Sequence, residues 1–282
     1  MAIQWFPGHM AKARRQVEEK LKLVDFVMEL VDARAPLSSQ NPMLQEVLQN
    51  KPKMIVLMKR DLADQRETDK WISYFKENNI TAIAINVNDK ADIKRVIQLG
   101  KELGKDKMEK LMKKGIQPRA ARAMIVGIPN VGKSTLINRL ANKNIAKTGD
   151  KPGVTKQQLW IKVKKDFELL DTPGILWPKF EDEIVGYRLA AIGTIKDQLL
   201  SLQDIVAFVI TYMQEHYPEK LEDRYSITRD MDDMLEIFEA IGKQRGALES
   251  GGHVNFQKVS DIVIRDLRTG RLGNITLETP QV

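Results

Sequence analysis

The chain has 282 residues and a formal net charge of +7, and with 43% hydrophobic and 29% charged residues it has the composition of a globular protein, not of a disordered one. The absence of cysteine excludes disulfides, cysteine–zinc sites and thiol catalysis, and three widely separated histidines argue against a histidine metal cluster. No apolar run reaches the ~18 residues of a membrane span and the N-terminus lacks the apolar core of a secretory signal, so we expect a cytoplasmic protein that does not contact membranes.

In chain order, the first 180 residues alternate short apolar runs with helical patterns. Continuous apolar runs are typical of strands buried on both faces of a parallel sheet, and they predict strands at residues 24–31, 53–58, 80–85, 123–126, 159–163 and 167–170. Amphipathic patterns predict helices between these strands at residues 41–49, 68–78, 93–113 and 133–141. This alternation predicts an α/β domain with a mostly parallel sheet and flanking helices.

After about residue 180 the pattern changes to helix after helix. Helices are predicted at residues 182–200, 202–216, 230–243 and 256–268, with no strand pattern between them. We therefore expect two domains, an α/β domain over residues 1–178 and an all-helical C-terminal domain over residues 179–282.

A glycine-rich motif follows the predicted strand 123–126 and opens the predicted helix 133–141. Residues 127–134 match the pattern G-x-x-x-x-G-K-S in the strand–turn–helix context that a phosphate loop requires. The glycines let backbone N–H groups surround phosphate oxygens, and the helix N-terminus adds partial positive charge. Lys133 is expected to reach the β- and γ-phosphates, and the Ser134 hydroxyl to bind Mg²⁺. The loop residues assigned to the nucleotide are Asn130, Val131, Gly132, Lys133, Ser134 and Thr135.

Two further segments complete a Mg²⁺ site in this pattern. Asp171 begins an Asp-Thr-Pro-Gly motif directly after the strand 167–170, where an acidic residue is the usual second partner of Mg²⁺, through water. Gly174 of the same motif offers a backbone N–H to the γ-phosphate and lets the chain move when that phosphate leaves. Thr155 lies in a loop between the two motifs and is the candidate that completes the metal shell. The ordered trio predicts a P-loop nucleotide hydrolase.

The motif that reads guanine, N-K-x-D at the end of a strand, is not found downstream of Gly174. Upstream, Asp61 follows the strand 53–58 and can accept hydrogen bonds from guanine N1–H and the exocyclic amine, which adenine does not offer. The fragment that we assign to the base is Met58, Lys59, Arg60 and Asp61, with the Lys59 stem over the base plane. Asn86 and Val87, after the strand 80–85, are expected to form a second base loop. For the fragment at residues 58–61 taken alone, a solvated turn is the alternative.

The motifs therefore follow a rotated order: the two base loops come first, then the phosphate loop, the Thr155 loop and Asp171. A parallel sheet tolerates this order because each motif lies at the C-terminal edge of its own strand.

At this point the chain resembles the circularly permuted ribosome-assembly GTPases, the RbgA/YlqF family. The resemblance covers essentially the whole chain and rests on residues 5–12 (Trp-Phe-Pro-Gly-His-Met-Ala-Lys), 32–36 (Asp-Ala-Arg-Ala-Pro) with Asn41 and Pro42, 127–135, 152–155 and 171–178. It implies GTP hydrolysis, a helical C-terminal domain and action on a late precursor of the large ribosomal subunit. One position departs from the family, whose base motif normally begins with asparagine where this chain has Met58. We expect weaker guanine affinity from this change, not a switch to ATP.

The position just after the Asp171 motif, where ordinary regulatory GTPases place a water-orienting glutamine, is Ile175. His9 is the leading catalytic candidate, because it follows a Pro-Gly turn and its ordinary pKa suits contact with a nucleophilic water. A helix-capping or RNA-contacting histidine is the alternative. Asn130 is the candidate for holding a K⁺ ion against the phosphates, as in similar phosphate loops.

The charge is uneven, with 34 basic against 20 acidic side chains in the first 180 residues and 11 against 18 in the rest. Such an excess attracts polyanions, in line with the partner that the resemblance implies, a precursor made of ribosomal RNA and proteins. No membrane partner is expected. Two clusters are predicted as basic helix faces, Lys12, Arg14, Arg15, Lys20 and Lys22, and Lys101, Lys105, Lys107, Lys110, Lys113, Lys114, Arg119 and Arg122. A GTP-regulated switch with a non-ribosomal protein partner and an ATP-driven enzyme are the competing functions. A monomer is the plain expectation.

Overall fold

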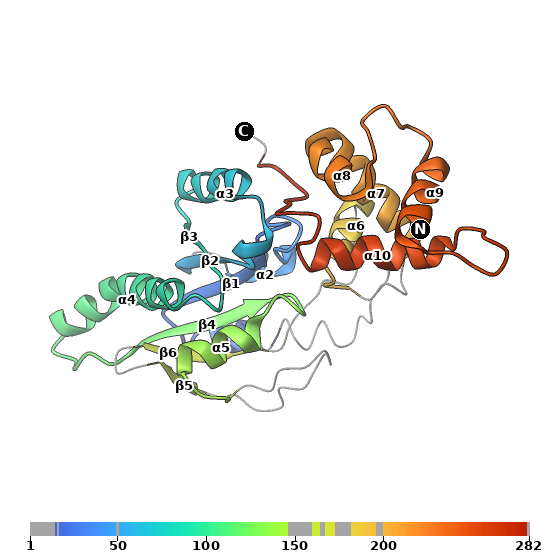
Figure 1. The fold of residues 1–282 in the computed structure, drawn as a ribbon. Helices are drawn as coiled ribbons and strands as arrows, with labels where there is room; N and C mark the ends of the chain where they lie inside the picture. Colours follow the sequence, from blue (N-terminus) through green and yellow to red (C-terminus); the bar gives the residue numbers. More distant parts are fainter. Residues whose placement is uncertain are drawn as a thin grey trace.

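A computed structural model describes residues 15, 17–48, 51–145, 160–163, 167–172, 182–195 and 200–280 (Figure 1). Within these residues, six strands form one sheet in the order β3-β2-β1-β4-β6-β5. Neighbouring strands are parallel throughout, except for the pairing of β5 with β6, which is antiparallel. The strands are β1 (Phe26–Asp32), β2 (Lys53–Met58), β3 (Thr81–Ala84), β4 (Ala121–Gly127), β5 (Trp160–Val163) and β6 (Phe167–Asp171).

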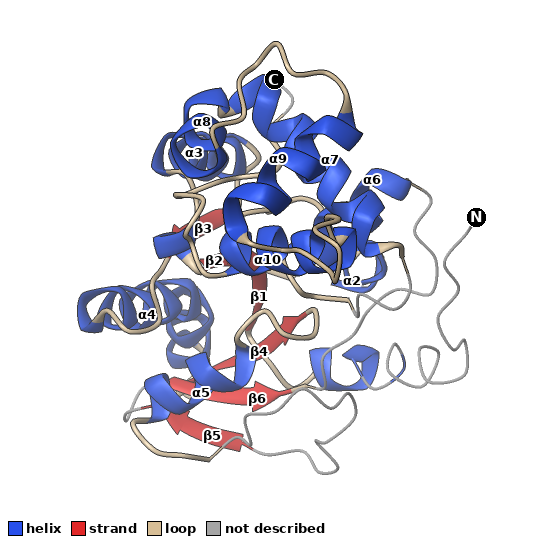
Figure 2. Cartoon of the chain, turned by 45° about the vertical axis from the view of Figure 1, so that its right-hand side comes forward, coloured by secondary structure: helices blue, strands red, loops and turns tan. Residues whose placement is uncertain are grey.

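Helices cover both faces of this sheet (Figure 2). On one face, the apolar sides of α4 and α5 pack against β1, β2 and β4, around residues such as Met28, Val56 and Ile125. The other face holds α3 and α2 together with a helical turn at residues 17–21. The helices are α2 (Pro42–Leu48), α3 (Gln65–Glu77), α4 (Lys90–Lys113) and α5 (Lys133–Ala141), and the short 3₁₀ helix η1 (Arg60–Leu62) follows β2. The predicted mostly parallel sheet with flanking helices is confirmed.

The C-terminal half is helical in the described residues and gathers near the C-terminal ends of the strands (Figure 2). Several of its helices begin at a side-chain cap, for example Asp233, which accepts a hydrogen bond from Leu235 N at 2.8 Å. The helices are α6 (Glu183–Ala191), α7 (Leu202–His216), α8 (Pro218–Tyr225), α9 (Met234–Arg245) and α10 (Phe256–Arg268). None of the helices in the described part of the chain is long and apolar enough to cross a bilayer.

After α10 the chain returns to the α/β half as an irregular segment, residues 273–280. Ile275 N donates to Leu62 O at 3.1 Å and Leu277 N donates to Arg34 O at 2.7 Å. The carboxylate of Glu278 accepts hydrogen bonds from Ser38 N at 2.9 Å and from Arg188 of α6 at 3.1 Å. Residues 275–278 are therefore hydrogen-bonded to the α/β half, next to β1 and η1.

Several helical predictions are wrong in detail; the helix expected over residues 230–243, for example, is α9, which starts four residues later. The helix expected over residues 182–200 ends at Ala191, because the chain turns at Gly193 with φ +81°. Helix α8 was not expected, although its sequence carries two signals for it, Pro218 in the first turn and the buried pair Leu221 and Tyr225, four residues apart. The predicted domain boundary between residues 178 and 179 lies outside the described residues.

Candidate nucleotide site

The strand register brings the predicted motifs to one edge of the sheet. Leu30 of β1 is paired with Gly127, at the end of β4. Asp32 is paired with Met58, and Ile125 with Asp171. Because these strands are parallel, the C-terminal ends of β1, β2, β4 and β6 lie at the same edge of the sheet. A ligand at this edge can therefore contact residues from all four strand ends.

The phosphate loop has the backbone geometry that its sequence requires. Gly132 has φ +105° and precedes the first residue of α5, and Asn130 has φ +60°. Glycine is needed at position 132 for its φ, and a Cβ at the same position would lie 3.1 Å from the flexible end of the Met58 side chain, at Cε. Val131 is buried in the core, the Lys133 side chain is mostly buried, Ser134 is partly buried, and Thr135 is exposed on the first turn of α5. The free N–H groups of this helix N-terminus can receive phosphate oxygens.

Lys133 and Asp171 form an ion pair across this loop. Lys133 Nζ lies 2.7 Å from Asp171 Oδ1 and also donates to the main-chain oxygen of Thr172. Thr172 is itself anchored, because its hydroxyl donates to Ile125 O at 2.6 Å. The side chains assigned to phosphate and to Mg²⁺ are therefore adjacent.

Lys20 is a site residue that the sequence analysis misplaced. It was assigned to an exposed basic face, but it is 6% exposed and its Nζ donates to Asp171 O at 3.3 Å. Burial lowers the pKa of Lys20. The nearby Asp171 carboxylate acts in the opposite direction and the Lys133 cation lowers the pKa further. The helical turn at residues 17–21 is thus tied to the strand that carries the metal motif.

The base loop touches the phosphate loop directly. Lys59 has φ +60°, and its Nζ donates to Asn130 O at 3.3 Å. Met58 is buried, with its side chain packed under Gly132. Asp61 follows in η1 and is exposed at the same edge. The predicted base-reading and phosphate-binding segments, which lie ~70 residues apart in the chain, are therefore neighbours in space.

Asn86 and Val87 lie beside the base loop, as the rotated order predicts. Arg60 N donates to Ile85 O at 3.0 Å, and the Arg60 guanidinium donates to Asp92 Oδ2 at 2.7 Å. The same Asp92 oxygen accepts a hydrogen bond from Asn86 N at 2.8 Å. Arg60 therefore braces the two loops against α4, and its guanidinium is committed to that role.

Asp32 and Arg34 are further site residues, which the sequence analysis used only as marks of a resemblance. Arg34 donates from Nε and Nη2 to the two oxygens of Asp32 at 2.9 and 2.8 Å, and Lys59 Nζ lies 2.9 Å from Asp32 Oδ2. Burial alone would raise the pKa of Asp32, but the Arg34 and Lys59 cations lower it below its ordinary value. The signal available in the sequence was an acidic residue at the end of a buried strand.

Three predicted site residues, His9, Thr155 and Gly174, lie outside the described residues. Among the residues that are described, no three histidine, cysteine or acidic side chains group as a self-contained metal site. Ser134 and Asp171 together offer one hydroxyl and one carboxylate, which suits a hard ion that takes its other ligands from phosphate and water.

Comparisons with known proteins agree with this arrangement. The family model described as a 50S ribosome-binding GTPase matches residues 122–243, so its match starts at the strand before the phosphate loop and leaves the base loops upstream. "Ribosome biogenesis GTPase A" of Bacillus cereus is 59% identical over 281 residues, with 100% of this chain and 95% of that protein covered. The protein of the same name from Bacillus pumilus is 56% identical, with 100% of both chains covered.

The fold is also that of a solved relative. The crystal structure of GNP-bound YlqF from T. maritima has a TM-score of 0.65 and 27% sequence identity, and covers 96% of this chain and 99% of its own. With the strand order, the adjacent loops and these relatives together, the chain belongs to the ribosome biogenesis GTPase A (RbgA/YlqF) family of circularly permuted P-loop GTPases, and it is a GTPase involved in ribosome assembly.

Proposed function

We propose that the protein binds a late precursor of the large (50S) ribosomal subunit in its GTP state, promotes maturation of that precursor and leaves after hydrolysis. The structural observation that supports this is a basic surface remote from the nucleotide. Helix α4 starts beside the base loops, and its distal half carries exposed lysines toward the opposite end of the sheet, before β4 begins (Figure 1). These lysines are Lys101, Lys105, Lys107, Lys110, Lys113 and Lys114.

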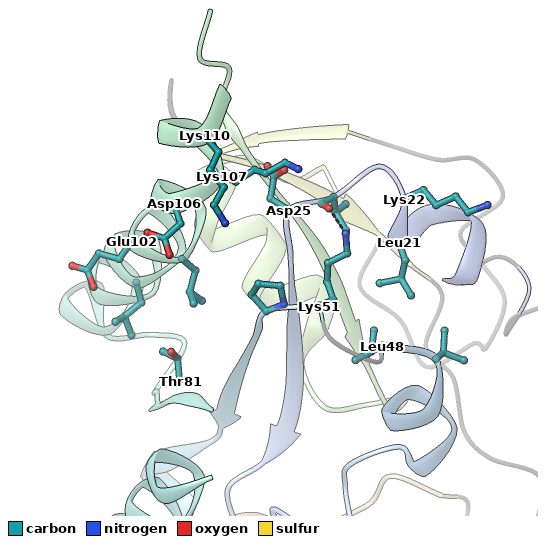
Figure 3. A pocket seen from close by; sticks show the side chains of 15 residues that line it. Leu21, Lys22, Asp25, Leu48, Lys51, Thr81, Glu102, Asp106, Lys107 and Lys110 are labelled. Atoms are coloured by element: carbon teal, nitrogen blue, oxygen red, sulfur yellow. Dashed lines mark hydrogen bonds between the residues drawn. The ribbon is translucent and has the colours of Figure 1, made fainter. Parts of the chain in front are cut away.

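The basic surface borders a groove of about 800 Å³ at the N-terminal edge of the sheet. Figure 3 shows Lys107 and Lys110 of α4 on one wall, Leu21 and Lys22 on the other, and Lys51 between them. Its acidic residues are Asp25, which is paired with Arg119 at 2.7 Å, and Glu102 and Asp106, which lie on the α4 wall (Figure 3). An RNA backbone that follows α4 would meet ammonium groups there.

Arg119 and Arg122 are less available for RNA contact than their place in the predicted basic cluster indicated, because both are engaged in ion pairs. Arg119 is bound to Asp25, and Arg122 pairs with Glu168 at 3.1 Å and lies over the Trp160 ring. In the described part of the N-terminal cluster, Arg15 and Lys22 are exposed whereas Lys20 is buried. The lysines of α4 are therefore the better candidates for RNA contact.

At the nucleotide edge, the proposed roles follow the geometry. Lys133 exchanges its contact with Asp171 for the phosphates, while Ser134, Asp171 and Thr155 hold Mg²⁺, which neutralises phosphate charge when bound. The phosphates are surrounded by Asn130, Val131, Gly132 and Thr135, and the γ-phosphate also meets Gly174. The base is contacted by Lys59, Asp61, Asn86 and Val87. His9 orients the attacking water. Met58 and Arg60 act on the base indirectly. Met58 packs against Gly132 of the phosphate loop, and Arg60 braces the two base loops against α4.

Asn130 is proposed as the K⁺ ligand. Its amide nitrogen donates to Gly193 O at 3.3 Å, so the amide oxygen is the atom that would bind K⁺. GTP hydrolysis measured in K⁺ and in Na⁺ tests this assignment. Wild type should hydrolyse GTP faster in K⁺ than in Na⁺, and Asn130→Ala should be equally fast in both. Equal rates for wild type in the two salts would show that K⁺ has no role in hydrolysis.

Sedimentation with purified ribosomal subunits tests the main proposal. With a GTP analogue the protein should co-sediment with 50S precursors, with GDP it should remain in the supernatant, and binding should weaken steeply with salt. Binding that ignores the nucleotide, or none to any ribosomal particle, would favour the competing function, a GTP-regulated switch with another protein partner. A soluble, cytoplasmic monomer is part of the proposal.

A further inference from the structure

Asp32 is a fully buried carboxylate that lies between two cations at the nucleotide edge. Its side chain is 0% exposed, and it binds Arg34 through two hydrogen bonds and Lys59 through one contact at 2.9 Å. It belongs to neither the phosphate loop nor the base motif. A buried charge of this kind is retained only where its partners are well placed, and here one partner is the lysine that faces the base.

The Lys59 side chain is held in its position by few contacts. The Lys59 backbone is in the left-handed region with φ +60°, and Nζ donates to Asn130 O in the phosphate loop at 3.3 Å. The side chain is 29% exposed, and a free lysine would lose several rotatable bonds of freedom on taking this pose. Asp32 holds Nζ on the inner side and so favours that pose before any nucleotide arrives.

Arg34 in turn fixes Asp32. Its Nη2 donates to Ile192 O at 3.2 Å, and its main-chain oxygen accepts the hydrogen bond from Leu277 N. The backbone N–H of Arg34 also donates to Asp32 Oδ1 at 3.0 Å. The carboxylate is therefore oriented by contacts that reach into the helical half of the molecule.

Met58 explains why this anchor matters in this chain. In the family pattern an asparagine at this position braces the base loop with its amide, whereas the buried Met58 side chain packs against Gly132 through apolar atoms alone. The polar tie between base loop and phosphate loop that the structure shows is the contact of Lys59 with Asn130 O. We infer that Asp32 is a positioning residue for guanine recognition, which supplies through Lys59 the brace that Met58 cannot make. This inference rests on the proposed assignment of Lys59 and Asp61 to the base.

The test is the ratio of dissociation constants for ADP and GDP, measured by calorimetry on the full chain with Mg²⁺. Asp32→Asn leaves Arg34 buried without its counter-charge, so the double variant Asp32→Asn/Arg34→Gln is measured beside it as a neutral pair that is safer for folding. Asp266→Asn is the matched control, because Asp266 is a 2% exposed carboxylate bound by Arg224 at 2.7 Å within the helical half. Thermal unfolding of each variant is recorded in parallel.

Both Asp32 variants should lose roughly tenfold or more of the guanine preference, while the affinity for ADP falls less, because adenine cannot use the hydrogen bonds of Asp61 that a well-placed base loop offers to guanine. Adding Met58→Asn to the double variant should restore part of the preference. Asp266→Asn should lower the unfolding temperature and leave the ratio unchanged. A wild-type ratio in the Asp32 variants, or an equal loss in Asp266→Asn, would overturn the inference.

Asp61→Asn separates this inference from the assignment on which it rests. If Asp61→Asn lowers the guanine preference and the Asp32 variants do not, the inference alone fails. If Asp61→Asn also leaves the preference intact, the base-loop assignment fails and the inference falls with it.

Discussion

Lys133 Nζ lies 2.7 Å from Asp171 Oδ1, so the lysine proposed to bind phosphate and the carboxylate proposed to bind Mg²⁺ neutralise each other in the structure. The pair is about nine-tenths buried on both sides, with side-chain exposures of 10% and 8%. With the proposed roles, a nucleotide with Mg²⁺ would offer each of them a new partner, phosphate for the lysine and the metal for the carboxylate. We therefore expect nucleotide binding to exchange this ion pair for those contacts.

Asp171→Asn should uncouple nucleotide binding from Mg²⁺. Without metal the variant should bind GDP at least as well as wild type, because Lys133 is released from its competing carboxylate. Wild type should bind GDP more tightly with Mg²⁺ than without it, and in Asp171→Asn this gain in affinity should vanish. GTP hydrolysis by the variant should fall roughly 10²-fold or more. The measurement is GDP affinity with Mg²⁺ and with a chelator. Glu168→Gln is the control, since Glu168 lies on the same strand and pairs with Arg122. A wild-type response to Mg²⁺ in Asp171→Asn would contradict this account.

The stability contributed by Asp32 should depend on pH with a definite sign. Its folded-state pKa is lowered from the ordinary value by Arg34 and Lys59, against the effect of burial. Its contribution is therefore fully present above the unfolded-state pKa of about 4 and is lost as pH falls toward the folded-state value. At neutral pH, Asp32→Asn should lower the free energy of unfolding by about 3–5 kcal/mol.

Urea unfolding of wild type and Asp32→Asn between pH 7 and pH 3 checks this expectation. The difference between the two proteins should be constant down to about pH 4 and should then shrink. A difference that grows on acidification would show that the carboxylate is stabilised in its protonated form instead.

Replacing the α4 lysines should reduce the salt dependence of binding to the ribosomal precursor. For Lys107, Lys110 and Lys113 changed together to glutamine, the slope of log affinity against log salt should become shallower by about 0.7–0.9 for each phosphate contact removed. The control changes three exposed lysines elsewhere, Lys70, Lys76 and Lys243. If both triple variants keep the wild-type slope, RNA does not bind along α4.

The strand ends could be predicted from the sequence because each site motif follows a buried apolar run. Strand β2 and helices α5, α7 and α10 have the predicted bounds, and the base, phosphate and metal motifs meet at one sheet edge as their order implied. The starts of α3 and α4 were predicted three residues late. Their true starts follow Asp64 and Asp89, whose carboxylates accept hydrogen bonds from Glu67 N and Ala91 N, so the caps were the better signal.

The contacts between distant segments could not be predicted. Lys20 looked like one member of an exposed basic row, and only the packing of residues 17–21 on the sheet brings its Nζ to Asp171 O. Arg34 lies 158 residues before Ile192, whose carbonyl it binds, and no local pattern encodes that pairing. Such long-range contacts depend on how the helical half returns to the sheet edge.

The central claim is that Asp61 and Lys133, from opposite ends of a rearranged nucleotide fold, bind the same guanine nucleotide. Asp61→Asn tests it most directly, because asparagine can donate a hydrogen bond to the C2 oxygen of xanthine but cannot accept both donors of guanine. By calorimetry, the variant should lose GDP affinity by at least ~10²-fold and bind xanthosine diphosphate more tightly than wild type does. Unchanged GDP affinity in this variant, together with no gain for xanthosine diphosphate, would contradict the account.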